Sequence, residues 1–187
     1  GAASGIGRAI ALRLASVGAN LFLLDVDEVG LHRVRLESRQ LGVDTAIMRC
    51  DVASMNDLQA VTDEALERWA GVDVFVNNAG VTYHGMTHRM PDEEWDRLLA
   101  INLHGPLNLT RLLLPSLLVR PEAHVLNVCS VLGLVGMPRV NAYCTSKFGL
   151  VGFSESLRAE YGRVGLGVTA LCPGFAETSL FSSAKPD

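Results

Sequence analysis

The chain has 187 residues, 49% of them hydrophobic and 19% charged, a balance typical of a folded globular domain rather than a disordered segment. Its formal net charge is −4 and it contains no run of Lys and Arg, so no nucleic-acid partner is expected. The most apolar stretch, residues 107–119, is interrupted by polar residues and proline and is too short to cross a bilayer, so no membrane partner is expected.

Apolar periodicity predicts helices that alternate with short apolar strands along the chain. The predicted helices span residues 5–17, 29–40, 55–69, 91–118 and 142–161, the fourth bent near Pro106. The predicted strands span residues 21–24, 45–48, 72–76, 125–129 and 167–171. Strands that are apolar on both faces and separated by helices indicate a parallel sheet covered on both sides. We therefore predict one α/β domain over residues 1–187, a Rossmann-type doubly wound sheet in three α/β/α layers.

Both ends of this domain are expected to be incomplete. Gly1 begins a glycine-rich loop of a kind that follows a strand, and no strand precedes it in the sequence. The chain stops in the polar stretch 182–187, soon after the last predicted strand. We therefore expect a fragment that lacks its first strand and its C-terminal elements.

The cysteines and histidines point to no metal site. His84 and His88 are four residues apart but have no clear third ligand. The four cysteines form no C-x-x-C pair, and three of them stand in or at the end of apolar strand-like runs, which indicates reduced thiols in a cytoplasmic protein. They are Cys50, Cys129, Cys144 and Cys172.

Gly1, Gly5 and Gly7 have G-x-x-x-G-x-G spacing and open the first predicted helix. Glycine lets a backbone approach a ligand closely, and a helix N-terminus offers free N–H groups to a pyrophosphate. The three glycines alone could also form a turn without a ligand. Asp25, which ends the next strand, favours dinucleotide binding, because an acid there accepts hydrogen bonds from the adenosine ribose.

Asp25 also bears on the choice of cofactor. A carboxylate about 4 Å from the extra phosphate of NADP would cost about 4 kcal/mol at an effective dielectric constant near 20, roughly a thousandfold in affinity. Val26 and Asp27 follow it rather than an arginine, so NAD is expected and NADP is disfavoured. Alternatively Asp25 only caps the following helix, a role that Asp27 could fill instead.

Polar and small residues also follow the next two strands. Asp51 is expected to accept the adenine amino group, although an Asp in a loop can equally be a turn residue. The segment 77–80, with the sequence N-N-A-G, can tie neighbouring loops together and let the cofactor pass close to Gly80. Taken alone, N-N-A-G would indicate only a turn.

Tyr143 and Lys147 are four residues apart in a predicted helix and therefore share one face, and Ser130 ends the preceding strand. These side chains suit hydride transfer at a carbon that bears oxygen, because the reaction needs a group that gives or takes a proton. An ammonium about 4 Å from a tyrosine can supply roughly the 4 kcal/mol needed to bring its pKa from about 10 to about 7. Y-x-x-x-K alone is also common in amphipathic helices with a surface lysine.

Together these motifs resemble the single-domain branch of the short-chain dehydrogenase/reductase family. The matching segments cover the whole chain in the family's order and spacing; they are residues 1–7, 77–80, 102–105, 130, 143–147 and 173–174. The resemblance implies that Tyr143 is the catalytic acid/base and that Ser130 orients the substrate. It implies that Lys147 binds the nicotinamide ribose and lowers the tyrosine pKa, and that Asn102 holds a water that connects Lys147 to solvent.

The resemblance also implies a cofactor-binding set that includes the two catalytic residues Tyr143 and Lys147. Pro173, Gly174 and Thr178 would lie by the nicotinamide, with Thr178 at its carboxamide. The remaining members of the set are Gly1, Ser4, Gly5, Ile6, Gly7, Asp25, Asp51, Val52, Asn78, Ala79 and Gly80.

The expected substrate is an uncharged secondary alcohol or ketone, because most residues that flank the catalytic ones are apolar. These flanking residues are His84, Met86, 132–137, Phe175, Leu180 and Phe181, the last two as a possible lid. The alternatives are an NADP-dependent 3-oxoacyl reductase and a non-catalytic dinucleotide-binding sensor of the same fold. The resemblance implies a homodimer or homotetramer that pairs through the helices 91–118 and 142–161.

Overall fold

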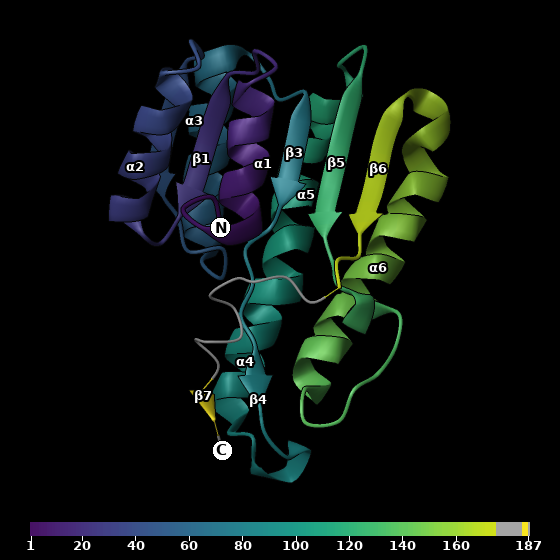
Figure 1. Ribbon diagram of the computed structural model, residues 1–187. Coiled ribbons are helices and arrows are strands. Elements are labelled where there is room, and N and C mark those ends of the chain that lie inside the picture. The colour runs from purple at the N-terminus through teal and green to yellow at the C-terminus, as the bar shows by residue number, and fades with distance from the viewer. Residues whose placement is uncertain (175–184, 187) are drawn as a thin grey trace.

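The computed structural model describes residues 1–174 and 185–186, and Figure 1 shows its main strands running in one direction among the helices. β1 (Leu21–Asp25) pairs in parallel with β2 (Thr45–Arg49). β3 (Val74–Asn77), β5 (Ala123–Val128) and β6 (Leu166–Leu171) form a second parallel sheet in the order β3-β5-β6. The predicted parallel α/β architecture is confirmed, and each predicted strand is present within two residues of its expected bounds.

Two features of the strands were not predicted. In the described part of the chain β1 and β3 belong to separate sheets, and the loop at Gly1–Ala3 lies between their carboxyl ends. The short strands β4 (Tyr83–His84) and β7 (Lys185–Pro186) also pair in parallel. Two residues are too few for an alternating pattern, so the sequence could not reveal them.

The first three helices differ in whether a side chain caps their N-terminus. They are α1 (Gly5–Ala15), α2 (Glu28–Arg39) and α3 (Met55–Trp69). The Asp27 side chain accepts a hydrogen bond from the N–H of Gly30 and caps α2, and Ser54 caps α3 in the same way at Asp57. Ser4 stands at the corresponding position of α1 and makes no such bond.

The long helix predicted over residues 91–118 is divided into three parts. These are α4 (Asp92–Leu99), a π-helical turn (Ala100–His104) and α5 (Gly105–Leu118). Pro106 has no N–H to give to the carbonyl of Asn102, and Gly105 donates to Ala100 five residues back. The bend predicted near Pro106 is therefore a π-helical turn that ends just before Pro106 and contains Asn102.

Three apolar clusters form the core. The largest packs α3 and α5 against β3, β5 and β6, and a second packs α1 and α2 against β1. The third lies between α4 and the N-terminal half of α6 (Asn141–Tyr161), and contains Tyr143. No described helix is long and apolar enough to cross a membrane. Short 3-10 segments complete the fold at Thr87–Arg89, Val131–Gly133 and Gly162–Val164.

Candidate active site

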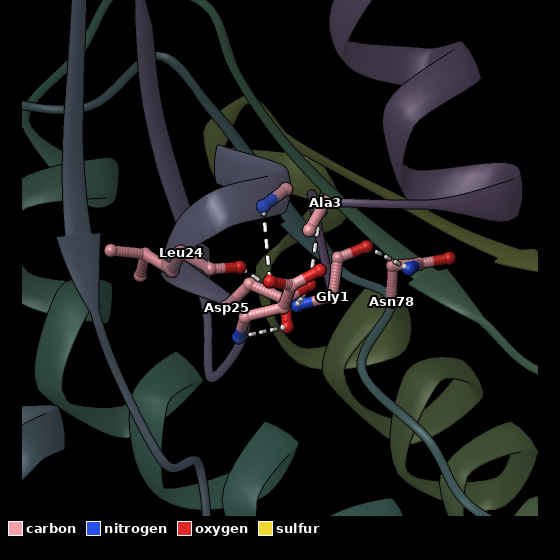
Figure 2. Close-up of polar contacts among 7 residues, drawn as sticks. Gly1, Ala3, Leu24, Asp25 and Asn78 are labelled. Carbon is pink, nitrogen blue, oxygen red and sulfur yellow. Dashed lines mark hydrogen bonds and ion pairs between the residues drawn. The ribbon is translucent and has the colours of Figure 1, made fainter. Parts of the chain in front are cut away.

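The glycine-rich loop is fixed between β1 and β3 by its backbone. Ala2 N–H donates to the carbonyl of Leu24 at 3.1 Å, and Asn78 Nδ2 donates to the carbonyl of Gly1 at 2.7 Å (Figure 2). A Cβ on Gly7 would lie 1.8 Å from that same Gly1 oxygen, so only glycine fits. Gly5 has φ of +51°, in the left-handed region that favours glycine. The loop thus requires glycine at the positions that the motif predicted.

Asp25 stands at the end of β1, and its two carboxylate oxygens bond the glycine-rich loop and the start of the turn before α2. Oδ2 accepts from Ala3 N–H at 2.9 Å, and Oδ1 accepts from Asp27 N–H at 3.0 Å (Figure 2). Burial favours the neutral acid, whereas the N–H groups of Ala3 and Asp27 favour the ionised form and lower the pKa of Asp25. Asp25 is therefore a carboxylate at neutral pH. Since Asp27 caps α2, the alternative role of Asp25 as the helix cap is excluded.

The N-terminus of α1 fits a pyrophosphate. Its N-cap residue Ser4 gives no side-chain cap, and no acidic residue stands in its first turn, in contrast to α2 and α3. The N–H groups of this turn and the helix dipole are thus available to an external anion. Ser4, Gly5 and Ile6 line the same cleft as Asp25. A dinucleotide with its ribose at Asp25 and its phosphates at α1 is compatible with this donor set.

Asp51 lies where it can serve both roles considered from the sequence. It lines the cleft beside Val52, and its Oδ1 accepts from Ala53 N–H at 2.9 Å, as a turn residue does. The π-turn packs tightly here, because a Cβ on Gly105 would lie 2.7 Å from the Val52 carbonyl. The cleft wall at Val52 is thus supported by the start of α5.

Ser130, Tyr143 and Lys147 meet at the carboxyl ends of β5 and β6. The Ser130 and Tyr143 side chains line the same cleft, and Ser130 Oγ accepts from Leu132 N–H at 3.1 Å. Lys147 Nζ lies 5.6 Å from the centroid of the Tyr143 ring and donates to the carbonyl of Val128 at 2.8 Å. The four-residue spacing therefore places the phenol and the amine side by side, as predicted.

The protonation of this pair differs from the expectation. Burial raises the pKa of Tyr143 although its hydrogen bond with Ser130 lowers it, and burial lowers the pKa of Lys147 to about 8. A lysine that loses its proton near pH 8 is already neutral when a tyrosine with an ordinary pKa of about 10 begins to ionise. Lys147 therefore does not lower the Tyr143 pKa in this state. Tyr143 is a protonated phenol at neutral pH, the form that donates a proton.

Asn102 is fully buried and connects the π-helical turn before α5 to two other parts of the site. Its side chain bonds both backbone groups of Val81, and its Nδ2 also donates to Ser146 Oγ at 3.2 Å. A Cβ on Gly80 would lie 3.5 Å from Asn102 Oδ1 and 3.8 Å from Lys147 Nζ. Asn102 thus lies next to Lys147, as the resemblance implies, and its described partners are protein groups.

One cleft of about 350 Å³ brings most of these residues together. Of the expected site residues, Gly7 and Asn102 do not line the cleft but bond or pack against residues that do. Thr178 lies outside the described residues. The expected residues that line it are Gly1, Ser4, Gly5, Ile6, Asp25, Asp51, Val52, Asn78, Ala79, Gly80, Ser130, Tyr143, Lys147, Pro173 and Gly174. The lining residues that sequence reasoning missed are Val26, Cys50, Val81, Arg97, Ile101, Val128, Cys129 and Val131.

The expected substrate-pocket residues are only partly placed at the cleft. Leu132 lines it, whereas His84, Met86 and residues 133–137 do not. Phe175, Leu180 and Phe181 lie outside the described residues. Arg97 and Ile101 were not predicted because they lie inside a helical segment. The only sequence signal for them is the four-residue spacing of Arg97, Ile101 and Gly105, which places all three on one helix face. Within the described ranges, no group of three or more His, Cys, Asp or Glu side chains could hold a metal ion.

Over residues 1–187 the chain matches the family described as short chain dehydrogenase. It is 32% identical over 182 residues to 3-oxoacyl-(acyl-carrier-protein) reductase FabG of Thermotoga maritima, covering 96% of this chain and 73% of that protein. A short chain dehydrogenase/reductase from Burkholderia phymatum in complex with NAD superposes with a TM-score of 0.94 and 34% identity. That match covers 98% of this chain and 66% of the other.

A second solved structure, a variant of actinorhodin polyketide ketoreductase with NADPH, gives a TM-score of 0.93 and 37% identity. The match covers 98% of this chain and 71% of that ketoreductase. The structurally similar proteins therefore include one bound to NAD and one bound to NADPH, and in length this chain spans 66–73% of the three proteins.

Proposed function

This chain belongs to the short-chain dehydrogenase/reductase family of NAD(P)-dependent oxidoreductases, and we propose that it transfers a hydride between NAD(H) and a secondary alcohol or ketone. One observation carries the proposal. Ser130, Tyr143 and Lys147 share a single cleft with the glycine-rich loop and Asp25. A protein that only bound a dinucleotide would need neither a buried phenol nor a buried hydroxyl in the same cleft, which is why a non-catalytic sensor is the weaker alternative.

In the proposed mechanism the bound nicotinamide supplies or accepts the hydride. Ser130 donates a hydrogen bond to the substrate oxygen and holds it beside Tyr143. Tyr143, a protonated phenol at neutral pH, gives its proton to that oxygen during ketone reduction, and takes it back during alcohol oxidation. Both steps need the Ser130 hydroxyl and the Tyr143 phenol at the same substrate oxygen, and both residues line the one cleft.

Lys147 and Asn102 complete the proposed proton path. The Lys147 amine lies beside the phenol ring and would bind the nicotinamide ribose. Because Pro106 offers no N–H, the backbone carbonyl of Asn102 lacks its α-helical partner and is suited to hold a water. That water would pass protons between Lys147 and solvent and return Tyr143 to its starting state.

Asp25 supports NAD over NADP. Its carboxylate is ionised, and in the described ranges no Lys or Arg forms an ion pair with it. A phosphate at the ribose would therefore meet a negative charge that no Lys or Arg side chain of the described ranges offsets. The second candidate is an NADP-dependent 3-oxoacyl reductase, favoured by the similarity to FabG and to the actinorhodin ketoreductase.

The proposed assembly is a homodimer or homotetramer that pairs through α5 and α6. Phe148 on α6 is 46% exposed, and an aromatic side chain on an outer helix face is suited to such an interface. The measurement of mass in solution by light scattering tests this assembly.

The activity is tested with the complete enzyme and a panel of secondary alcohols, ketones, sugars and 3-oxoacyl thioesters. Nicotinamide absorbance is followed with NAD(H) and with NADP(H) in parallel. Turnover of an alcohol or ketone with NAD(H) supports the proposal. Turnover of 3-oxoacyl thioesters with NADPH alone favours the second candidate. Tight NADH binding without turnover of any compound favours the sensor.

A further inference from the structure

Cys129 and Cys172 occupy matching positions at the carboxyl ends of two neighbouring strands. Cys129 follows β5 and Cys172 follows β6, whose last paired residues are Val128 and Leu171. The N–H of Cys129 donates to the carbonyl of Leu171 at 2.8 Å, so the parallel pairing continues to these cysteines. Both are free thiols.

The register places both thiols on the same face of the sheet. Side chains alternate along a strand, so the partners at positions 125 and 168, 127 and 170, and 129 and 172 share one face. Adjacent strands lie about 4.8 Å apart, within the range of about 4.4–6.8 Å between Cα atoms that a disulfide spans. No large backbone movement is therefore needed to join them.

The two thiols differ in exposure and share a cationic neighbour. Cys129 is 3% exposed, whereas Cys172 is half-buried and therefore more accessible to solvent. Lys147 lies close enough to both for its charge to interact with each. Burial raises the pKa of Cys129 to about 11, so Cys129 is a poor first nucleophile. Cys172 is the thiol that an oxidant would reach first.

We propose that Cys129 and Cys172 form a redox modification site, which closes to a disulfide when the protein meets a hydroperoxide. The Cys172 sulfur attacks one peroxide oxygen, the O–O bond breaks, and a sulfenic acid and water form. The Cys129 sulfur then attacks the Cys172 sulfur, the S–O bond breaks, and a second water leaves. Two thiols and one hydrogen peroxide thus give one disulfide and two waters.

This disulfide would act directly on the candidate active site. Ser130 follows Cys129 and Pro173 follows Cys172 in the sequence, and the Val131 N–H bonds the Pro173 carbonyl at 2.9 Å. Closing the disulfide fixes the two strand ends to each other and shifts the neighbouring Ser130 relative to Tyr143, and a misplacement of about 1 Å can cost about a hundredfold in rate. The consequence for turnover rests on the proposed function, whereas formation of the disulfide does not.

The experiment treats the complete protein with hydrogen peroxide, blocks the remaining thiols by alkylation, and digests it with trypsin. Arg139, Lys147 and Arg163 separate Cys129, Cys144 and Cys172 into three peptides, so mass spectrometry identifies which pair is linked. We expect the peptides of Cys129 and Cys172 to be joined, with the loss of two hydrogen atoms, and dithiothreitol to release them. The link is expected in the Cys144→Ser control and absent in Cys172→Ser.

Overoxidation of Cys172 without a link, or a link to another cysteine, overturns the proposal. Turnover is measured on the same samples, and a fall of about tenfold or more that dithiothreitol reverses is expected for the linked enzyme. If the link forms and turnover stays unchanged, the modification site stands and its effect on the active site is refuted. If the protein shows no turnover before oxidation, only the proposed function fails, because the peptide analysis does not depend on activity.

Discussion

The side chain of Asn102 holds the backbone of Val81 from both sides. Its Oδ1 accepts the Val81 N–H and its Nδ2 donates to the Val81 carbonyl, each at 2.8 Å. This pair of bonds connects the π-turn to the segment that follows β3, where Gly80 lines the cleft. The wall of the cleft at Gly80 therefore depends on a residue that does not itself line the cleft.

The substitution Asn102→Leu keeps the approximate size and removes both bonds. The two Val81 groups then lose their partners, which is expected to cost about 2 kcal/mol in the free energy of unfolding. Turnover is expected to fall more than the affinity for substrate. Urea unfolding and steady-state kinetics check this, with Asn108→Leu on α5 as the control. Equal effects in both variants would show that Asn102 has no special role.

The substitution Asp25→Asn tests the basis of cofactor choice. The amide keeps one acceptor oxygen for the loop and removes the negative charge that faces the ribose position. We expect the ratio of kcat/KM for NADPH to that for NADH to rise by about a hundredfold. Asp27→Asn is the matched control, since it removes a charge two residues away and asparagine still caps α2. An equal NADPH-to-NADH ratio of kcat/KM in both variants would contradict the role of Asp25 in selecting NAD.

The substitution Gly7→Ala tests whether the glycine-rich loop needs the close contact between Gly7 and the Gly1 carbonyl. The new Cβ would lie 1.8 Å from the Gly1 oxygen, so the loop must move away from Asn78. We expect NADH affinity to fall by about tenfold or more, since the pyrophosphate loses a preformed cradle. Gly136→Ala, at a glycine whose Cβ would meet nothing within 4 Å, is expected to bind NADH normally. Fluorescence titration with NADH compares the two, and normal binding by Gly7→Ala would refute the geometry.

Sequence patterns located the main chemistry because short spacings carry it. Tyr143 and Lys147 are one helical turn apart and Asp25 ends a strand, so periodicity predicted a shared helix face and a place at the sheet edge, whereas the family resemblance implied their roles. Periodicity could not show that Asn102 lies in a π-turn, because two features combine to form that turn. Pro106 stands four residues after Asn102, and Gly105 packs closely against Val52. Contacts between distant segments stay invisible to spacing, which is why the pairing of β4 with β7 was also missed.

The buried amine of Lys147 makes stability depend on pH in a defined direction. Burial lowers its pKa from 10.5 to about 8, so between these values the unfolded chain holds a proton that the folded chain has released. Raising the pH through this window therefore stabilises the fold, by about 3 kcal/mol at most. We expect wild type to gain stability relative to Lys147→Met as the pH rises from 8 towards 10.5. Urea unfolding at several pH values measures this, and a difference that is constant with pH would contradict it.

The central claim is that Tyr143 is the group that exchanges a proton with the substrate. The most direct measurement is turnover by Tyr143→Phe in the complete enzyme, with NADH affinity measured on the same sample by fluorescence. We predict that turnover falls by about a hundredfold or more while NADH affinity is unchanged, because phenylalanine removes only the hydroxyl. A variant that binds NADH normally and keeps turnover close to that of wild type would show that another group supplies the proton.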